Sequence, residues 1–293
     1  MRDNENQLIS IVIPCFNSGN ILKRAIDSVF DQTWKDFEIV LVNDGSNDKS
    51  TLRIFDLFKR RPAFRLINQN NLGLPAARNA GARNAKGKYL FFLDADDWIE
   101  PASLELMFSH IRENEDKVFI FSDIKLEGES HNLVRKEYNF FEQLFINQVP
   151  YSIFISKKNW SMAGGYDEIM RDGYEDWEFN IRLGAAGIYG KRLAKTLFHY
   201  NVSNSGMLLS RSSKLHAKIW NYILKKNNKL FEISQMLKIW FKWRNKPSSY
   251  PLVFFFGWFF LLKLLPEPLV SKLFIKLRNL KWFFTRNNIF NIK

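Results

Sequence analysis

Short apolar runs alternate with amphipathic stretches through the first half of the chain. The runs predict five buried strands, at residues 10–14, 37–42, 64–67, 89–93 and 118–122. Between them, apolar positions recur at the spacing of helices that cover a sheet. Continuous apolar strands separated by helices are typical of a mostly parallel sheet with helices on both faces. We therefore predict an α/β fold whose ligands bind beyond the carboxyl ends of the strands.

Helical patterns dominate the last third of the chain. Residues 206–246 are expected to form basic amphipathic helix, and the eleven consecutive apolar positions at 252–262 are too few to span a bilayer, which takes about 20 residues. In residues 269–284 the apolar side chains share one face and lysines lie off it, as in helices of a membrane interface. The face consists of Leu269, Leu273, Leu277, Leu280 and Phe284. We predict a folded domain at 1–205 and a helical region at 206–293.

The charge is unevenly distributed along the 293 residues. The net charge is +13, but residues 201–293 hold 17 Lys and Arg against two acids, whereas the first 200 residues hold 26 basic and 28 acidic side chains. A basic, aromatic-rich segment on a near-neutral body points to an anionic membrane surface or to nucleic acid. The 46% of hydrophobic residues excludes a disordered chain.

The cysteine content and the N-terminal segment bear on the class of protein and on its compartment. The chain has a single cysteine, Cys15, which excludes internal disulfide bonds and a cysteine-based zinc cluster. The first residues, MRDNENQ, are polar, so we expect no signal peptide.

Three carboxylates crowd directly after the fourth predicted strand, in Asp94-Ala95-Asp96-Asp97. Such crowding costs free energy unless a cation neutralises it. Carboxylate oxygens suit Mg²⁺ or Mn²⁺, with phosphate oxygens completing the coordination. The alternative is an acidic helix N-terminus before Pro101, where carboxylates interact favourably with the helix dipole. The motif alone leaves both interpretations open.

Polar or aromatic residues also follow the first two predicted strands. Asp44, in Asn43-Asp44-Gly45-Ser46, could accept hydrogen bonds from a base or a ribose, although the segment also fits an ordinary turn. In Pro14-Cys15-Phe16-Asn17, the Phe16 ring could stack on a base, but packing in the core is the simpler interpretation. Arg78 is a candidate diphosphate or base clamp, or else an exposed helix arginine.

Two adjacent acids, Glu175 and Asp176, open a predicted helix at 175–186. Acids at a helix start are common because they complement the helix dipole. The functional alternative is a general base held on a rigid scaffold.

The order of these motifs resembles glycosyltransferase family 2. The resemblance covers about residues 8–205 and is carried by SIVIPCFN, IVLVNDGSND, NLGLPAARNAGARNAKGKYLFFLDADDWIEP, GGYDE and GYEDWEF. It implies a GT-A-type fold: a mostly parallel nucleotide-binding sheet flanked by helices, here followed by the basic helical region. It also implies an inverting, metal-dependent transfer of a sugar from a nucleotide sugar, usually a UDP-sugar.

The resemblance assigns a role to each candidate side chain. Asp176 corresponds to the catalytic base, with Glu175 beside it as the alternative. Asp96 corresponds to the ligand of Mn²⁺ or Mg²⁺, with Asp94 facing the ribose and sharing the metal site. The remaining donor-binding positions are Phe16 packing on the base, Asp44 on the uracil and Arg78 on the nucleotide, together with Pro14 and Asn17.

One segment departs from the family pattern. Many relatives carry Tyr-Arg-x-His after the Glu-Asp helix, and here the segment is Tyr200-Asn201-Val202-Ser203. His199 precedes the tyrosine and is expected on the other side of an extended segment. The departure bears on nucleotide choice and metal affinity and leaves the acidic residues in place.

We therefore expect a hexosyl- or N-acetylhexosaminyltransferase that acts on a lipid-linked or cell-surface glycan and binds no nucleic acid. We expect it in the cytoplasm, held on the inner face of the membrane by residues 206–293. For these residues the alternative is that their helices pack on the catalytic domain or form a dimer contact. One alternative is a sugar-nucleotide-forming nucleotidylyltransferase. Such an enzyme needs a glycine-rich phosphate loop after the first strand, and the segment Phe16-Asn17-Ser18-Gly19 at that position has only one glycine. The other is a non-enzymatic membrane adaptor, which leaves the acidic motifs unexplained.

Overall fold

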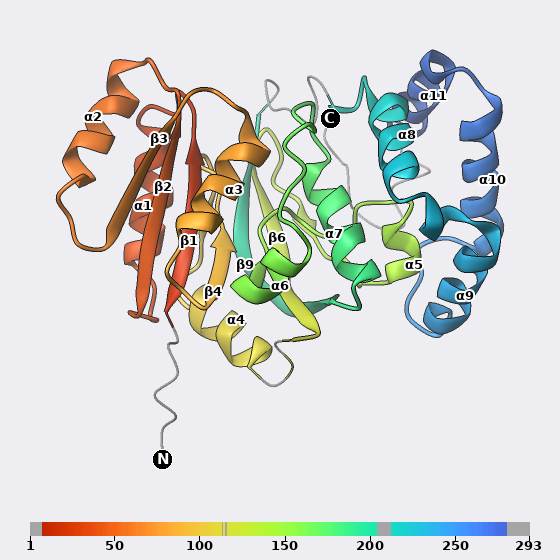
Figure 1. Cartoon of the computed structure of the whole chain (residues 1–293), viewed down its shortest axis with the longest axis horizontal. Helices are drawn as coiled ribbons and strands as arrows, with labels where there is room; N and C mark the ends of the chain where they lie inside the picture. The colour runs from red at the N-terminus through yellow and green to blue at the C-terminus, as the bar shows by residue number, and fades with distance from the viewer. Residues whose placement is uncertain (1–7, 113, 115, 204–211, 280–293) are drawn as a thin grey trace.

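The computed structural model describes residues 8–112, 114, 116–203 and 212–279, with the backbone alone for 277–279. In this part of the chain nine strands form one sheet in the order β3-β2-β1-β4-β8-β6-β9-β5, with β7 beside β6 (Figure 1). The strands are β1 (Ile9–Cys15), β2 (Phe37–Asp44), β3 (Phe64–Gln69), β4 (Tyr89–Phe92), β5 (Trp98–Ile99), β6 (Val118–Gly128), β7 (Leu133–Val134), β8 (Phe154–Ser156) and β9 (Tyr189–Val202).

The first half of the sheet confirms the sequence pattern. Strands β3, β2, β1 and β4 are parallel neighbours, and every residue of β1 is buried. Helix α3 (Leu74–Asn84) lies so close to β1 that a Cβ atom at Gly81 would come within 2.3 Å of Val12 Cγ1. The helices of this half are α1 (Ile21–Phe30), α2 (Lys49–Phe58), α3 (Leu74–Asn84) and α4 (Ser103–Ile111).

The second half of the sheet mixes strand directions. Strand β8 is antiparallel to both β4 and β6, so β6 and its parallel neighbour β9 run in the same direction as the first four strands. Strands β5 and β7 are antiparallel to β9 and β6. The sheet is therefore mostly parallel, as predicted. The helices here are α5 (Phe140–Gln143), α6 (Lys157–Met162) and α7 (Glu175–Ala185).

The described part of the C-terminal region is helical and consists of several short helices. Within residues 212–279 the structure has α8 (His216–Lys226), the 3-10 helix η2 (Asn228–Phe231), α9 (Ile233–Trp243), α10 (Leu252–Leu264) and α11 (Glu267–Asn279). Helix α8 ends before Asn227, and Glu232 has extended backbone angles before α9 begins. The Leu277 side chain, Leu280 and Phe284, predicted on one apolar face, lie outside the described residues.

The C-terminal helices pack against the rest of the molecule (Figure 1). Phe255 and Phe259 of α10 are 1% exposed, and the Phe255 ring lies 5.4 Å and 5.2 Å from the rings of Phe141 and Phe145. Buried side chains from both sides of residue 205 belong to one hydrophobic core. None of the described helices is long and apolar enough to cross a bilayer.

Candidate active site

A cavity of about 1150 Å³ opens at the carboxyl ends of β1, β2 and β4 and extends past the start of α7. All of the site residues expected from the sequence line it: Pro14, Phe16, Asn17, Asp44, Arg78, Asp94, Asp96, Glu175 and Asp176. Segments far apart along the chain therefore meet at one edge of the sheet, where an α/β fold binds its ligands.

Arg78 links the acidic motif after β4 to the start of α7. Its side chain is 1% exposed, and its guanidinium donates to both carboxylate oxygens of Asp94 at 2.8 Å and to Glu175 Oε1 at 2.6 Å. The guanidinium also lies over the Tyr151 ring, 4.5 Å from its centroid. Arg78 is therefore a buried bridge between two carboxylates, and the exposed-arginine interpretation is wrong.

The third acid of the motif, Asp97, is held in place by hydrogen bonds to other parts of the chain. Asp97 is buried and accepts hydrogen bonds from the Tyr151 hydroxyl and, at 2.7 Å, from the backbone N–H of Asn201. The Tyr151 hydroxyl in turn accepts from the Asp94 N–H at 2.9 Å. Asp97 thus fixes the loop after β4 to the end of β9, so the sequence pattern alone overstates the number of carboxylates available to a cation.

Asp96 faces the cavity. Within the described ranges its carboxylate makes no hydrogen bond or ion pair with another residue, while its carbonyl accepts from Arg24 at 2.9 Å. The surrounding protein and then the Asp94 carboxylate raise the pKa of Asp96 to about 6. A divalent cation would relieve that repulsion, so Asp94 and Asp96 fit a site that uses one or two carboxylates plus phosphate oxygens. No cluster of three or more His, Cys, Asp or Glu side chains suited to a metal occurs in the described part of the chain.

Asp44 holds the loop before α3. It is 4% exposed and accepts from Gln69 Nε2 at 2.7 Å and from the N–H groups of Leu72 and Gly73 at 2.8 and 2.9 Å. Three donors leave about one of its four acceptor sites open toward the cavity.

Phe16 does not pack in the core as the simpler interpretation expects. Its ring is 49% exposed at the cavity, where it is free to stack on a ligand. Asn17 beside it has a left-handed backbone, with φ of 50°, and its Oδ1 accepts from the N–H of Asn47 at 2.9 Å. This contact joins the loops after β1 and β2.

The two acids that open α7 have different surroundings. Glu175 is buried against Arg78, and burial raises the pKa of Glu175 to about 7 in spite of that partner. Asp176 is half-buried, lines the cavity, and accepts one hydrogen bond from Asn147 Nδ2 at 2.9 Å. Burial raises the pKa of Asp176 as well. Asp176 is therefore the better placed of the two to take a proton from a ligand.

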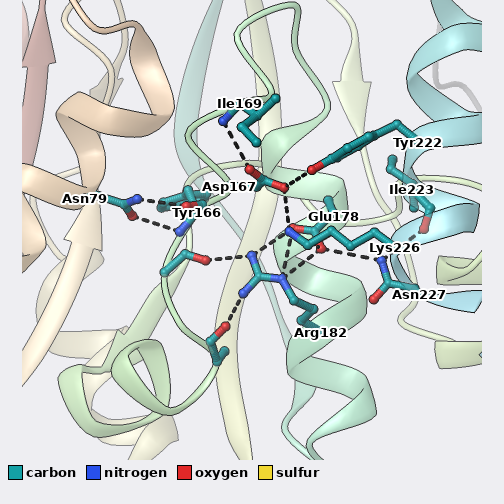
Figure 2. A network of polar contacts seen from close by, with 12 residues as sticks. Asn79, Tyr166, Asp167, Ile169, Glu178, Arg182, Tyr222, Ile223, Lys226 and Asn227 are labelled. Carbon is teal, nitrogen blue, oxygen red and sulfur yellow. Dashed lines mark hydrogen bonds and ion pairs between the residues drawn. The ribbon is translucent and has the colours of Figure 1, made fainter.

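A second polar network, made of residues that do not line the cavity, connects α7 to α8 (Figure 2). Glu178 is fully buried and pairs with Arg182 at 2.8 Å and with Lys226 of α8 at 3.1 Å. Lys226 and Tyr222 also donate to Asp167, each at 2.6 Å. The network was not predicted. Its one sequence signal is the spacing of four residues between Glu178 and Arg182.

His199 points away from the cavity, as expected. Its Nε2 lies 2.7 Å from Glu100 Oε1 and its Nδ1 lies 3.0 Å from Glu127 Oε1. The imidazole stacks on Trp98 with ring centroids 4.9 Å apart. It therefore has no part in the lining, whereas Tyr200, Asn201 and Ser203 do.

From the sequence, acceptor-facing residues are expected mainly in 124–172 and the C-terminal region, but no individual residue of the far part of the cavity could be identified. Its lining there comes from β6, β7, the segment after β7 and the C-terminal helices: Phe121, Ile124, Leu126, Val134, Lys136, Tyr250, Phe254, Trp258 and Phe274. These residues lie in stretches that carry no recognisable motif.

Comparisons with known proteins agree with this architecture. The chain is 28% identical over 272 residues to an uncharacterized glycosyltransferase, MJ1057, of Methanocaldococcus jannaschii, covering 87% of this chain and 86% of that protein. It is 27% identical over 201 residues to hyaluronan synthase of Pasteurella multocida, covering 67% of this chain. The chain spans only 20% of the length of that synthase.

A solved structure shares the fold. The crystal structure of S. aureus TarS 1–349 in complex with UDP-GlcNAc superimposes with a TM-score of 0.64 and 18% sequence identity, covering 81% of this chain and 71% of that one. The fold is thus of the GT-A type, with the mixed sheet and flanking helices described above. A sequence profile of glycosyl transferase family 2 matches residues 10–168, which is more than half of the chain. The chain belongs to glycosyl transferase family 2.

Proposed function

We propose that this chain is an inverting glycosyltransferase that moves a hexosyl or N-acetylhexosaminyl group from a UDP-sugar to a hydroxyl of a lipid-linked or cell-surface glycan. The observation that carries the proposal is that Asp176 and the Asp94-Ala95-Asp96 motif line one cavity, where Arg78 joins Asp94 to Glu175, the neighbour of Asp176. The UDP-GlcNAc complex of TarS supports a UDP-sugar donor, and the likeness to hyaluronan synthase supports a glycan acceptor.

The residues suggest the following chemistry. Asp176 takes the proton of the acceptor hydroxyl, whose oxygen forms a bond to the anomeric carbon from the face opposite the diphosphate. The bond from the anomeric carbon to the diphosphate oxygen breaks, UDP leaves with the electron pair, and the configuration inverts. Asp94 and Asp96 would hold Mn²⁺ or Mg²⁺, which supplies positive charge toward the leaving diphosphate. Phe16 and Asp44 are the groups available to the base.

We predict that the Asp96→Asn variant loses metal-dependent release of UDP from UDP-sugars while its melting temperature stays within a few degrees of the wild type. The side chain is exposed to the cavity and has no hydrogen bond or ion pair with the residues described, so its loss removes a cation ligand and little else. A panel of nucleotide sugars with and without EDTA provides the measurement. Asp116→Asn, an exposed acid paired with Lys158 at 2.8 Å, is the matched control.

Two outcomes decide the proposal. Turnover that is unaffected by EDTA would reject the cation site. A product that contains a new nucleotide sugar, rather than free UDP, would indicate a nucleotidylyltransferase instead.

We also propose that residues 206–293 hold the protein on an anionic membrane surface at the inner face of the cytoplasmic membrane. Helix α10 buries Phe255 and Phe259, but Val253 and Leu264 are 81% and 80% exposed, with the exposed Lys263 beside them. An apolar face with adjacent lysines suits the boundary between lipid headgroups and acyl chains.

We predict that the Val253→Ser/Leu264→Ser variant co-sediments with phosphatidylglycerol-containing vesicles about tenfold more weakly than the wild type, because less apolar surface enters the lipid. Point substitutions are preferable to deletion, since removing α10 would uncover the core around Phe141. Leu57→Ser, at a 65% exposed leucine of α2, is the control. Equal sedimentation of all three proteins, or equal binding to purely zwitterionic vesicles, would reject the membrane role.

A further inference from the structure

The cavity is larger than a donor site requires. Pockets for ligands of drug size have volumes of about 300–1000 Å³, and this one has about 1150 Å³. The lining residues assigned to the donor occupy the end near β1, β2 and β4. The other end, past Asp176, is walled by aromatic side chains of the C-terminal region: Tyr250, Phe254, Trp258 and Phe274.

Lys136 reaches this end of the cavity from the segment that follows β7. Its neighbours Arg135 and Glu137 are exposed and form ion pairs, with Asp123 at 3.7 Å and with Arg192. Lys136 lies on the other side of the segment, half-buried in the cavity lining. Among the residues that the structure describes, its ammonium has no hydrogen bond and no ion pair.

The nearest acid does not neutralise Lys136. Burial lowers the pKa of Lys136 to about 8, and the charge of Glu142 opposes that change only in part. Glu142 is itself buried, and its oxygens accept from Ser248 Oγ, the Ser249 N–H and, at 2.6 Å, Gln148 Nε2. Glu142 therefore anchors the segment that brings the aromatic wall into place and leaves Lys136 without a direct counter-ion.

Among the described residues, both arginines that line the cavity have hydrogen-bond partners, and those of Arg78 are charged. Arg78 pairs with Asp94 and Glu175, and Arg171 donates to Asn71 Oδ1 at 3.0 Å. Burying an unpaired ammonium is costly, so a position that retains one is suited to an anion that arrives with a ligand.

We propose that this end of the cavity binds the acceptor as an anionic saccharide, whose carboxylate or phosphate pairs with Lys136 while its ring packs on the aromatic wall. The proposal rests on the transferase function above and deepens it by naming the class of acceptor. Sugar rings present apolar C–H faces, which aromatic side chains cover, and the anion satisfies the remaining cation.

The test is binding of simple probes to the full chain saturated with UDP and Mn²⁺, so that the donor end is blocked. The probes are methyl β-glucuronide, glucose 6-phosphate and the neutral methyl β-glucoside, and their dissociation constants are measured by NMR titration. We expect one or both anionic probes to bind about tenfold or more tightly than the neutral one, the usual gain from a charge-assisted hydrogen bond. The tighter of the two anionic probes identifies the carboxylate or the phosphate as the recognised group.

The variants assign the preference to one side chain. Lys136→Met should abolish it, Lys136→Arg should retain part of it, and Lys195→Met, at an exposed lysine outside the lining, should keep it in full. Because Lys136→Met removes a partly desolvated charge, its melting temperature should equal or exceed that of the wild type, which shows that the variant folds.

Two results would overturn the inference: equal affinity for charged and neutral probes, or a preference that survives in Lys136→Met. The affinity for UDP, measured by a separate titration of the same proteins before UDP is added to saturation, separates this outcome from failure of the proposed function. A chain that binds UDP but shows no anion preference has lost only the acceptor assignment.

Discussion

Replacement of Asp176 with asparagine should lower the turnover number by about 10²–10⁴-fold, the usual contribution of a positioned general base. The amide keeps the size of the side chain and can still bond to Asn147, but it cannot take a proton from the acceptor. Because the base contacts the acceptor, the affinity for the UDP-sugar should change little. Steady-state kinetics together with calorimetric titration of UDP measure the two effects separately.

The pH profile provides a second readout for the same residue. A base must be deprotonated to act, so the rate is retained above its pKa and lost as the pH falls through it. Burial raises the pKa of Asp176, so the acidic limb of kcat/KM should lie above the ordinary aspartate value of 3.8. The residual activity of Asp176→Asn should lack that limb.

Glu175→Gln is the matched comparison, because it changes the adjacent acid, which pairs with Arg78. We expect its defect to include weaker folding, whereas Asp176→Asn should fold normally. A collapse of UDP affinity in Asp176→Asn would place Asp176 in the donor site and leave Glu175 as the candidate base.

Replacement of Arg78 with methionine should lower the free energy of unfolding by about 3–5 kcal/mol, since it leaves two mostly buried carboxylates without their partner. The Asp94 and Glu175 side chains are 19% and 6% exposed, so water compensates them poorly. Urea denaturation measures the loss. Arg83→Met, on the same helix and paired with Glu168 at 3.1 Å on the surface, should cost less than about 1 kcal/mol.

The loss in Arg78→Met should depend on pH in a definite direction. Without the guanidinium the pKa of Glu175, already raised to about 7 by burial, should rise further. A carboxyl whose pKa is raised in the folded state destabilises the fold when it is ionised and not when it is protonated. The deficit should therefore be largest above neutral pH and shrink as the pH falls. A deficit that grows on acidification would show that Arg78 does not neutralise these acids.

The part of the fold that could be predicted is the part whose strands are buried on both faces. Strands β1, β2 and β4 and the start of β6 are mostly apolar runs, which can be recognised directly in the sequence. Strand β3 is also predicted, although it lies at the edge of the sheet and is only partly buried. Strand β8 has only three residues, too few for a pattern. Strand β9 carries lysines and an arginine because its first half is only partly buried, so it looks like a loop in sequence.

For the site, the positions of the residues along the chain could be predicted, but the contacts between distant residues could not. The donor-side residues follow strand ends, and their positions could be inferred from the chain order alone. That Arg78 bridges Asp94 and Glu175 could not, because the partners lie 16 and 97 positions away. Lys136 lies in a stretch with no motif. Its significance depends on the lack of an ion-pair partner for its ammonium among the described residues, which only the three-dimensional structure shows.

The contact of Phe255 with Phe141 and Phe145 has a consequence for how the molecule is made. The ribosome releases Phe141 more than a hundred residues before Phe255, an interval on the order of 10 s at a synthesis rate of about 5–20 residues per second. Throughout that time the nascent chain presents an uncovered aromatic surface to chaperones and proteases. Truncated products that stop before α10 should consequently be cleared from the cell, and the aromatic wall of the cavity can form only after α10 has been synthesised.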